Sequence, residues 1–148
     1  MELEKHITKS EEETLELGLK FAEMLKEGDL VAISGDLGTG KTEFVKGICR
    51  YFDVEEIVSS PTFTIMNKYN AGEEYGGISI YHIDLYRIEK KEDLDEIGFQ
   101  ECIFSDTAIK IIEWAEKADG FLPNTGYKIN IKSSEEDESE RVFHIKKF

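Results

Sequence analysis

Residues 35–42 read Gly-Asp-Leu-Gly-Thr-Gly-Lys-Thr, a complete G-x-x-x-x-G-K-[ST] phosphate-binding loop. The apolar residues 30–33 before it predict a short strand, and residues 42–51 after it predict a helix. The three glycines allow backbone N–H groups to turn inward around phosphates, and the helix start adds its own N–H groups and positive dipole end. A chance glycine-rich turn is the alternative, but the flanking strand and helix favour a nucleotide site in an α/β fold.

The residues of this loop have separate predicted roles. Lys41 is expected to reach the outer phosphates, and the Thr42 hydroxyl to hold Mg²⁺. The pattern does not distinguish ATP from GTP. The predicted nucleotide contacts from the loop are Gly35, Asp36, Leu37, Gly38, Thr39, Gly40, Lys41 and Thr42.

Length and charge limit the class of protein. The 148 residues predict one domain, 1–148, that is long enough to bury a core. The formal net charge of −14 predicts repulsion from nucleic acid and anionic membranes, so any role in a nucleic-acid pathway is expected to act through a protein partner. Cys49 and Cys102 lack C-x-x-C spacing, and there is neither a secretory signal nor a membrane-length apolar run, so we expect a cytoplasmic protein with reduced cysteines.

Helices and strands are predicted along the whole chain. Ser10 and Glu13 form a capping box for a helix that we expect Gly28 to stop. A further helix is expected over 92–97, closed by Gly98. Strands are predicted at 5–8, 62–69, 78–83, 108–112, 127–131 and 142–145, with 62–69 and 78–83 as an antiparallel hairpin and the acidic stretch 133–140 as the loop between the last two.

These elements predict an α/β fold of the phosphate-loop NTPase type. It would have three layers, a mixed β-sheet and a C-terminal antiparallel strand pair.

Two carboxylates follow predicted strands directly. Asp84 follows 78–83 and Glu113 follows 109–112. Ligands in such folds gather at the carboxyl ends of the sheet strands, so we expect at least one of the two to be linked to Mg²⁺. Either residue alone could be an ordinary surface carboxylate, and which of them binds directly stays open.

Three further features have two interpretations each. Thr62, in the segment 60–63 (Ser-Pro-Thr-Phe), could be a switch hydroxyl that senses the γ-phosphate, or Pro61 could simply begin an edge strand. His82 lies in a predicted strand, and we expect a packed or hydrogen-bonded histidine rather than a metal ligand. Trp114 could contact the nucleotide or cover the core.

Two other nucleotide-binding classes fit poorly. Residues 67–70 resemble the guanine-reading N-K-x-D motif, but Asn70 replaces its aspartate, and residues 95–98 (D-x-x-G) lack a preceding apolar strand. A small-molecule kinase would use several arginines on a lid. This chain has only Arg50, Arg87 and Arg141.

Taken in order, the motifs resemble those of the bacterial TsaE (YjeE) family, the ATPase component of tRNA threonylcarbamoyladenosine biosynthesis. The matching pieces are the loop 35–42, Ser60-Pro61-Thr62-Phe63, His82-Ile83-Asp84-Leu85-Tyr86-Arg87 and Ile112-Glu113-Trp114. They span most of the chain. Glu43 departs from the family pattern, which often has a second Thr or Ser there.

The resemblance implies a weak Mg²⁺-dependent ATPase that works with a TsaD-type and a TsaB-type protein. Hydrolysis would reset that complex between turnovers, and tRNA would be contacted only indirectly, through the partners. Low activity alone is reasonable because no arginine is obviously placed as a finger, so a partner could supply one or order the switch. The alternatives are a nucleotide-gated binding module without significant turnover and, less well supported, a small-molecule kinase.

The resemblance also implies roles for individual residues. Lys41 would stabilise phosphate charge, Glu113 would complete the metal site or position water, and Asp84 would be the Walker B-like acid. Thr62 would be the switch hydroxyl. Residues near the nucleotide would include Trp114, with Glu11 and Arg141 as the nearest matches to two further family positions.

Overall fold

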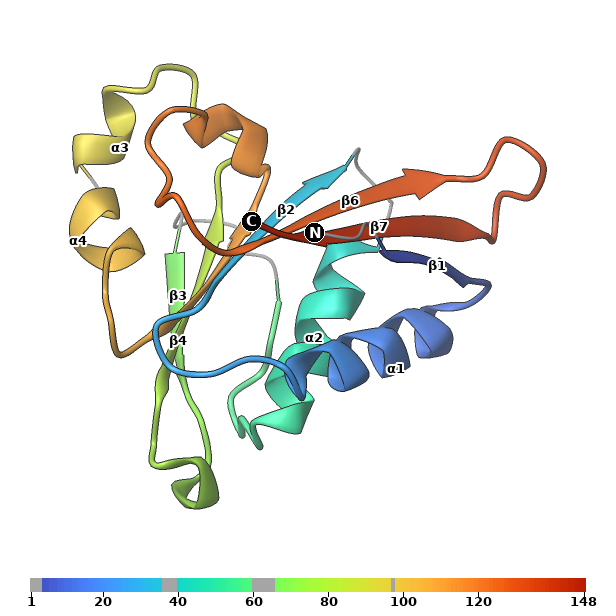
Figure 1. Cartoon of the computed structure of the whole chain (residues 1–148), viewed down its shortest axis with the longest axis horizontal. Helices are drawn as coiled ribbons and strands as arrows, with labels where there is room; N and C mark the ends of the chain where they lie inside the picture. The colour runs from blue at the N-terminus through green and yellow to red at the C-terminus, as the bar shows by residue number, and fades with distance from the viewer. Residues whose placement is uncertain (1–3, 36–39, 60–65, 97) are drawn as a thin grey trace.

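The structure is a computed structural model that describes residues 4–35, 40–59, 66–96 and 98–148 (Figure 1). Within these residues the strands form one seven-stranded sheet in the order β1-β7-β6-β2-β5-β4-β3. The strands are β1 (Glu4–Thr8), β2 (Leu30–Gly35), β3 (Met66–Asn70), β4 (Ser79–Asp84), β5 (Ile109–Glu113), β6 (Tyr127–Ser133) and β7 (Arg141–Lys147). The helices are α1 (Glu11–Ala22), α2 (Lys41–Tyr51), α3 (Asp93–Glu96) and α4 (Phe99–Ile103), with 3₁₀ turns η1 (Glu73–Tyr75) and η2 (Ala115–Ala118).

The sheet is mixed. β2 pairs in parallel with β5 and with β6, and β5 pairs in parallel with β4. β1–β7, β6–β7 and β3–β4 are antiparallel. The predicted mixed sheet, the hairpin β3–β4 and the C-terminal strand pair β6–β7 are therefore confirmed.

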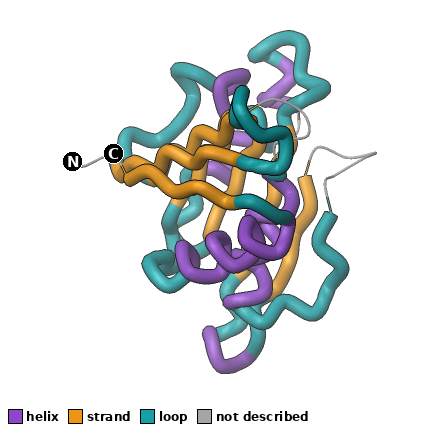
Figure 2. Tube along the Cα trace, turned by 90° about the vertical axis from the view of Figure 1, so that its right-hand side faces the viewer, coloured by secondary structure: helices purple, strands orange, loops and turns teal. Residues whose placement is uncertain are grey.

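Helices cover both faces of the sheet, which gives three layers. Figures 1 and 2 show α1 and α2 side by side against one face. Alternate residues of a strand point to opposite faces. Accordingly, Val31 and Ile33 of β2 enter the core beneath α1 and α2, whereas Leu30 and Ala32 enter the second core, which contains residues of α4 and η2. A strand buried on both faces reads as a continuous apolar run, as residues 30–33 do.

Two glycines allow α1 and α2 to cross at close range. A Cβ on Gly47 would lie 2.1 Å from the Leu15 carbonyl oxygen, and one on Gly18 would lie 2.2 Å from the Phe44 carbonyl oxygen. Both obstacles are backbone atoms, which a rotamer change cannot relieve. The crossing therefore requires glycine on both helices, and it fixes α2, the helix that follows the phosphate loop.

The observed start of α1 agrees with the predicted start, but the observed end differs from the predicted one. The Ser10 hydroxyl accepts a hydrogen bond from the Glu13 N–H at 3.1 Å, as the capping box predicts. The Glu13 carboxylate accepts from the Lys9 N–H instead of from Ser10. The prediction that Gly28 stops this helix is wrong, since α1 ends at Ala22. Gly28, at φ 88°, instead donates to the Ala108 carbonyl at the entry to β2.

Gly98 also has a different role from the predicted one. The single helix expected over 92–97 is replaced by two short helices, α3 and α4, and Gly98 with φ 69° is the N-cap of the second. A left-handed glycine lets the chain change direction between them. Residues 62–65 of the predicted strand 62–69 lie outside the described residues, and β3 begins at Met66.

Both cysteines are buried and free. Burial raises the pKa of Cys49 to about 12 and that of Cys102 to about 11. These thiols are therefore poor nucleophiles, as expected of cysteines that serve packing. Among the described residues, no helix combines the length and the apolarity needed to cross a membrane.

Candidate functional site

The two described ends of the phosphate loop lie close to each other. Gly35 ends β2, and Gly40, at φ 88°, is the N-cap of α2. Lys41, only 6% exposed, donates a hydrogen bond from Nζ to the Gly35 carbonyl. Half-buried Thr42 follows in the first turn of α2. The lysine thus bridges the strand before the loop and the helix after it; residues 36–39 (Asp-Leu-Gly-Thr) lie outside the described residues.

The two strand-end carboxylates are neighbours. Because β4 and β5 are parallel and in register, Asp84 lies opposite Glu113, and Glu113 in turn pairs in register with Ile33 of β2. Both predicted carboxylates therefore lie at the carboxyl edge of the sheet, Glu113 directly beside the strand that leads into the phosphate loop and Asp84 one strand further along. Their predicted roles need this placement.

The negative charge of the Asp84 carboxylate is disfavoured by its surroundings. Burial raises the pKa of its carboxyl group, and the charge of Glu113 adds to that rise. The Tyr86 N–H, which donates to Oδ1 at 2.9 Å, acts in the opposite direction, as do His82 and Lys41. A carboxylate whose negative charge is disfavoured in this way is one that a bound cation would stabilise.

Replacing this carboxylate is expected to stabilise the protein. In Asp84→Asn, the amide oxygen can still accept from Tyr86, while the disfavoured charge is gone. Because Asp84 is only half-buried and solvent screens part of its charge, we expect a small gain, below about 1 kcal/mol, in the free energy of unfolding near pH 8. The measurement is thermal unfolding in EDTA without nucleotide.

The pH dependence of that gain follows from the sign of the shift. A raised carboxyl pKa means that the folded state binds the proton more tightly than the unfolded state does. The stabilisation that the protonated aspartate gives the folded state is therefore lost as the pH rises through the pKa of the folded state. The advantage of the asparagine variant should therefore shrink as pH falls toward about 4, the ordinary range of an aspartate. A variant less stable than wild type at pH 8 would contradict this account.

Glu113 is engaged by a buried histidine. His82 Nε2 and Glu113 Oε2 form a hydrogen bond, and both side chains are almost inaccessible, with residue exposures of 0% and 2%. On its other side, His82 Nδ1 lies 3.2 Å from the Tyr69 hydroxyl. The prediction of a packed, hydrogen-bonded histidine is confirmed. That its partner would be Glu113 was not predicted, because the two residues lie 31 positions apart.

The interpretation that Trp114 covers the core is confirmed, and its contact with the nucleotide stays a prediction. It is half-buried against the second core, and Lys41 Nζ lies 4.4 Å from its ring centroid. Its backbone is left-handed at φ 60°, which is uncommon outside glycine and brings the ring next to the loop lysine. The Tyr86 ring packs against it at 5.1 Å.

Lys117 is a second cation at this place that the sequence did not reveal. Its Nζ donates to the carbonyl oxygens of Tyr86 and Ile88 and lies 5.9 Å from the Trp114 ring. It lies in the 3₁₀ turn η2, where no apolar period marks which face a residue takes. Its position next to Trp114 follows only from how η2 packs on the sheet.

The start of α1 and the start of β7 border the loop. The Thr14 methyl group lies 3.6 Å from where a Cβ on Gly40 would be, and the Thr14 and Thr8 hydroxyls are 2.8 Å apart. Thr8 pairs in register with Arg141. Glu11 is exposed in the first turn of α1 and Arg141 is half-buried at the start of β7; that they lie near the nucleotide stays a prediction. Thr62 and the rest of 60–63 lie outside the described residues.

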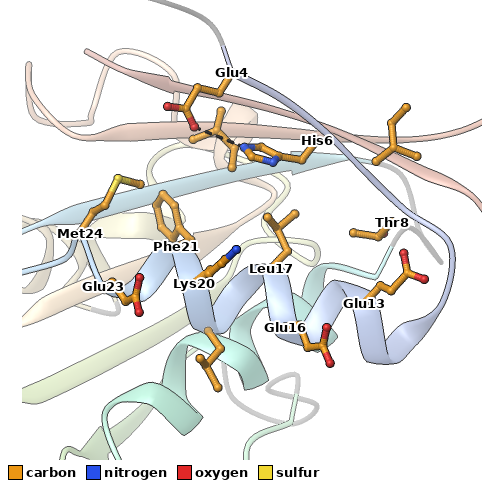
Figure 3. A pocket seen from close by; sticks show the side chains of 13 residues that line it. Glu4, His6, Thr8, Glu13, Glu16, Leu17, Lys20, Phe21, Glu23 and Met24 are labelled. Atoms are coloured by element: carbon orange, nitrogen blue, oxygen red, sulfur yellow. Dashed lines mark hydrogen bonds and ion pairs between the residues drawn. The ribbon is translucent and has the colours of Figure 1, made fainter.

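A separate groove lies between α1 and the strands β1 and β7, with a volume of about 690 Å³ (Figure 3). Glu4, Glu13, Glu16 and Glu23 line it, against one lysine, Lys20, and His6. Such a wall repels a triphosphate. The charge of this groove therefore does not favour it as a nucleotide site, and the phosphate loop remains the predicted one.

The oxygen donors beside the loop suit magnesium. They are the Thr42 hydroxyl and the carboxylates of Asp84 and Glu113. Mg²⁺ prefers oxygen ligands, keeps several waters, and is usually held by one or two carboxylates together with substrate phosphates. This donor set therefore fits a magnesium ion that arrives with a nucleotide.

Comparisons with known proteins agree with one another. The family model described as "Threonylcarbamoyl adenosine biosynthesis protein TsaE" matches residues 8–143. A Bacillus subtilis protein named tRNA threonylcarbamoyladenosine biosynthesis protein TsaE is 37% identical over 136 residues, which cover 92% of this chain and 82% of the relative. Proteins of the same name from Nostoc sp. and Treponema pallidum are 39% and 35% identical and cover 93% and 85% of the chain, and 82% and 89% of the relatives.

A solved structure shares the fold. The crystal structure of Bacillus subtilis YdiB superposes with a TM-score of 0.75 at 31% identity, over 97% of this chain and 84% of YdiB. The predicted architecture, a phosphate-loop NTPase-like α/β fold, is thereby confirmed.

Proposed function

Since this chain belongs to the TsaE family of tRNA threonylcarbamoyladenosine biosynthesis, we propose that it binds ATP with Mg²⁺ and hydrolyses the ATP in support of that modification. One observation carries the proposal. Lys41 joins the two ends of a phosphate loop beside a pair of carboxylates, Asp84 and Glu113, that the parallel strands hold in register. A phosphate cradle next to acid residues is the arrangement that phosphoryl transfer from a nucleotide requires.

The residues divide the work by position. The loop backbone from Gly35 to Gly40 would cradle the phosphates, and Lys41 would balance charge on the β- and γ-phosphates. The Thr42 hydroxyl with Asp84 or Glu113 would hold magnesium, which when bound neutralises phosphate charge. The remaining carboxylate, which we take to be Glu113, would orient the attacking water. Catalysis of this kind is mostly positioning and charge stabilisation.

The partners would be a TsaD-type and a TsaB-type protein in the cytoplasm. The charge of −14 supports indirect contact with tRNA, because an acidic surface repels the nucleic-acid backbone. Hydrolysis here would reset the partner complex rather than perform the transfer of the threonylcarbamoyl group. A partner could also supply an arginine to the site, since this chain has only three arginines.

The test is ATP turnover with Mg²⁺, first with the purified protein alone and then with TsaD-type and TsaB-type partners and tRNA. Slow turnover alone that changes when the partners are added supports the proposal. Turnover that is the same with and without both partners would contradict their role. Phosphate transfer to a small acceptor, with no partner response, would indicate a kinase instead.

Two carboxylate variants separate the acid roles. If Glu113 orients water, Glu113→Gln should keep Mg²⁺-dependent ATP binding but stop turnover, while Asp84→Asn should weaken the Mg²⁺ dependence of binding. The reverse pattern would exchange the two roles.

One observation favours a second candidate, a nucleotide-gated binding module. His82 already engages Oε2 of Glu113, which leaves one oxygen of that carboxylate for either Mg²⁺ or a water, and if Mg²⁺ takes it Glu113 does not serve as a base. Tight ATP binding without turnover, both alone and with partners, would support this candidate over the ATPase.

A further inference from the structure

We propose that His82 and Tyr69 are positioning residues that hold the Glu113 carboxylate in the orientation that ATP hydrolysis needs. This inference rests on the proposed function. It assigns to the histidine and tyrosine a role in catalysis that acts through Glu113, without contact to the nucleotide.

The geometry is a continuous chain of polar contacts across three strands. Glu113 on β5 bonds to His82 on β4, and His82 Nδ1 lies 3.2 Å from the Tyr69 hydroxyl on β3. The tyrosine hydroxyl also lies 3.3 Å from the Ser59 carbonyl oxygen. Asn67 Nδ2 lies 3.4 Å from that carbonyl and 3.4 Å from the tyrosine hydroxyl.

The number of hydrogens on each group limits which group can donate in each of these polar contacts. The Tyr69 hydroxyl has one hydrogen, so it cannot donate to both His82 and Ser59. When it donates to Nδ1 of a neutral imidazole, Nε2 carries the ring proton and donates to Glu113 Oε2. Asn67 then donates to the Ser59 carbonyl, so the donors and acceptors of the chain are matched. The proton on Nε2 is required by the Glu113 carboxylate, which can only accept, and a hydroxyl that donates to Nδ1 supports the same tautomer.

Because these three side chains are buried, their polar contacts control the orientation of Glu113. Tyr69, His82 and Glu113 are 3%, 0% and 2% exposed, so water cannot replace the contacts if one is lost. The bond to Oε2 limits the rotation of the carboxylate and leaves Oε1 as the oxygen that would bind a water or a metal ion. An outer partner that orients a site residue in this way commonly matters to activity by about 10–100-fold.

The first test removes one oxygen atom. Tyr69→Phe keeps the ring and deletes the hydroxyl; we expect kcat for ATP to fall about 10-fold while the Kd for Mg·ATP changes less than about 2-fold. Tyr127→Phe is the matched control, since Tyr127 is also a buried tyrosine of the sheet, packed edge-on against Phe21. Its kcat should equal that of wild type. Equal kcat in wild type and Tyr69→Phe would overturn the proposal.

Two histidine variants distinguish the two contacts. Glutamine can place its amide N–H where Nε2 lies and so keep the bond to Glu113, whereas asparagine reaches only as far as Nδ1. We expect His82→Gln to retain more turnover than His82→Asn, at similar melting temperatures. A purely structural histidine would instead give turnover that tracks melting temperature in both variants, with unchanged kcat per folded molecule.

A spectroscopic readout is independent of hydrolysis. A buried imidazole N–H bonded to a carboxylate should give a solvent-protected, downfield proton NMR signal, which His82→Gln removes and Tyr69→Phe shifts. Absence of this signal in folded wild-type protein would overturn the inference. If the signal is present, the wild-type protein hydrolyses ATP and Tyr69→Phe keeps full turnover, then only the positioning role is rejected. If the signal is present but the wild-type protein does not hydrolyse ATP at all, the ATPase proposal is rejected. The catalytic role of the contacts among Tyr69, His82 and Glu113 is then rejected as well.

Discussion

Lys41→Ala is expected to lower ATP turnover by about 100-fold or more. In the proposed mechanism the lysine ammonium is the cation that balances phosphate charge, and removing one preorganised charge-stabilising group typically costs 10²–10³ in rate. Its side chain also bridges Gly35 and lies over Trp114, so the alanine variant loses the link between the two loop ends. The measurement is steady-state ATP hydrolysis, with ATP binding followed in parallel by Trp114 fluorescence.

The control for this experiment is Lys46→Ala on the same helix. Lys46 forms an i,i+3 ion pair with Glu43 at 3.1 Å and is not among the predicted nucleotide contacts. Such a pair is worth well under about 1 kcal/mol, so its loss should leave turnover near the wild-type value. Full turnover in Lys41→Ala would remove the phosphate loop from the mechanism.

Gly47→Ala is expected to destabilise the fold by about 3 kcal/mol, at the upper end of overpacking penalties. Helix propensity alone predicts the opposite sign, because alanine is favoured over glycine inside a helix by about 1 kcal/mol. The new Cβ, however, would lie 2.1 Å from the Leu15 carbonyl oxygen and 2.9 Å from the Leu19 nitrogen. The two helices would have to separate, and the packing between them would be lost.

Urea or thermal unfolding measures this effect. Arg50→Ala, at an exposed position on the same helix, is the control, and its cost should stay below about 1 kcal/mol. Stabilisation by Gly47→Ala would show that α1 and α2 are not in backbone contact. Because α2 begins at Lys41, we also expect weaker ATP binding in this variant at temperatures where it is still folded.

The fold was predictable where the signal is local. The strand 30–33, the helix after the loop and the last strand pair follow from apolar runs and turn residues, which act within a few positions. The register of Asp84 against Glu113 was also within reach, since parallel strands bring their carboxyl ends to one edge. The boundaries at Gly28 and Gly98 were wrong because a glycine can end a helix, cap the next one or enter a strand, and only the surrounding packing decides.

The parts of the site that sequence reasoning missed depend on distant pairs. The contact of His82 with Glu113 joins different strands, and Lys117 reaches the tryptophan only through the placement of η2. Gly18 and Gly47 look like weak points in two helices until the helices are packed together. Neither residue in any of these pairs carries a local signal of its partner.

The pairing of β1 with β7 has a consequence for how the chain matures during translation. β1 can pair with its neighbour only when residues 141–147, which lie far later in the sequence, have left the ribosome. The α1–α2 pair and β2 can form earlier, but Thr8, which joins the start of α1 to β7 beside the phosphate loop, cannot reach its final place until then. The surroundings of Gly40 at the start of α2 should therefore be completed late, after β7 has left the ribosome.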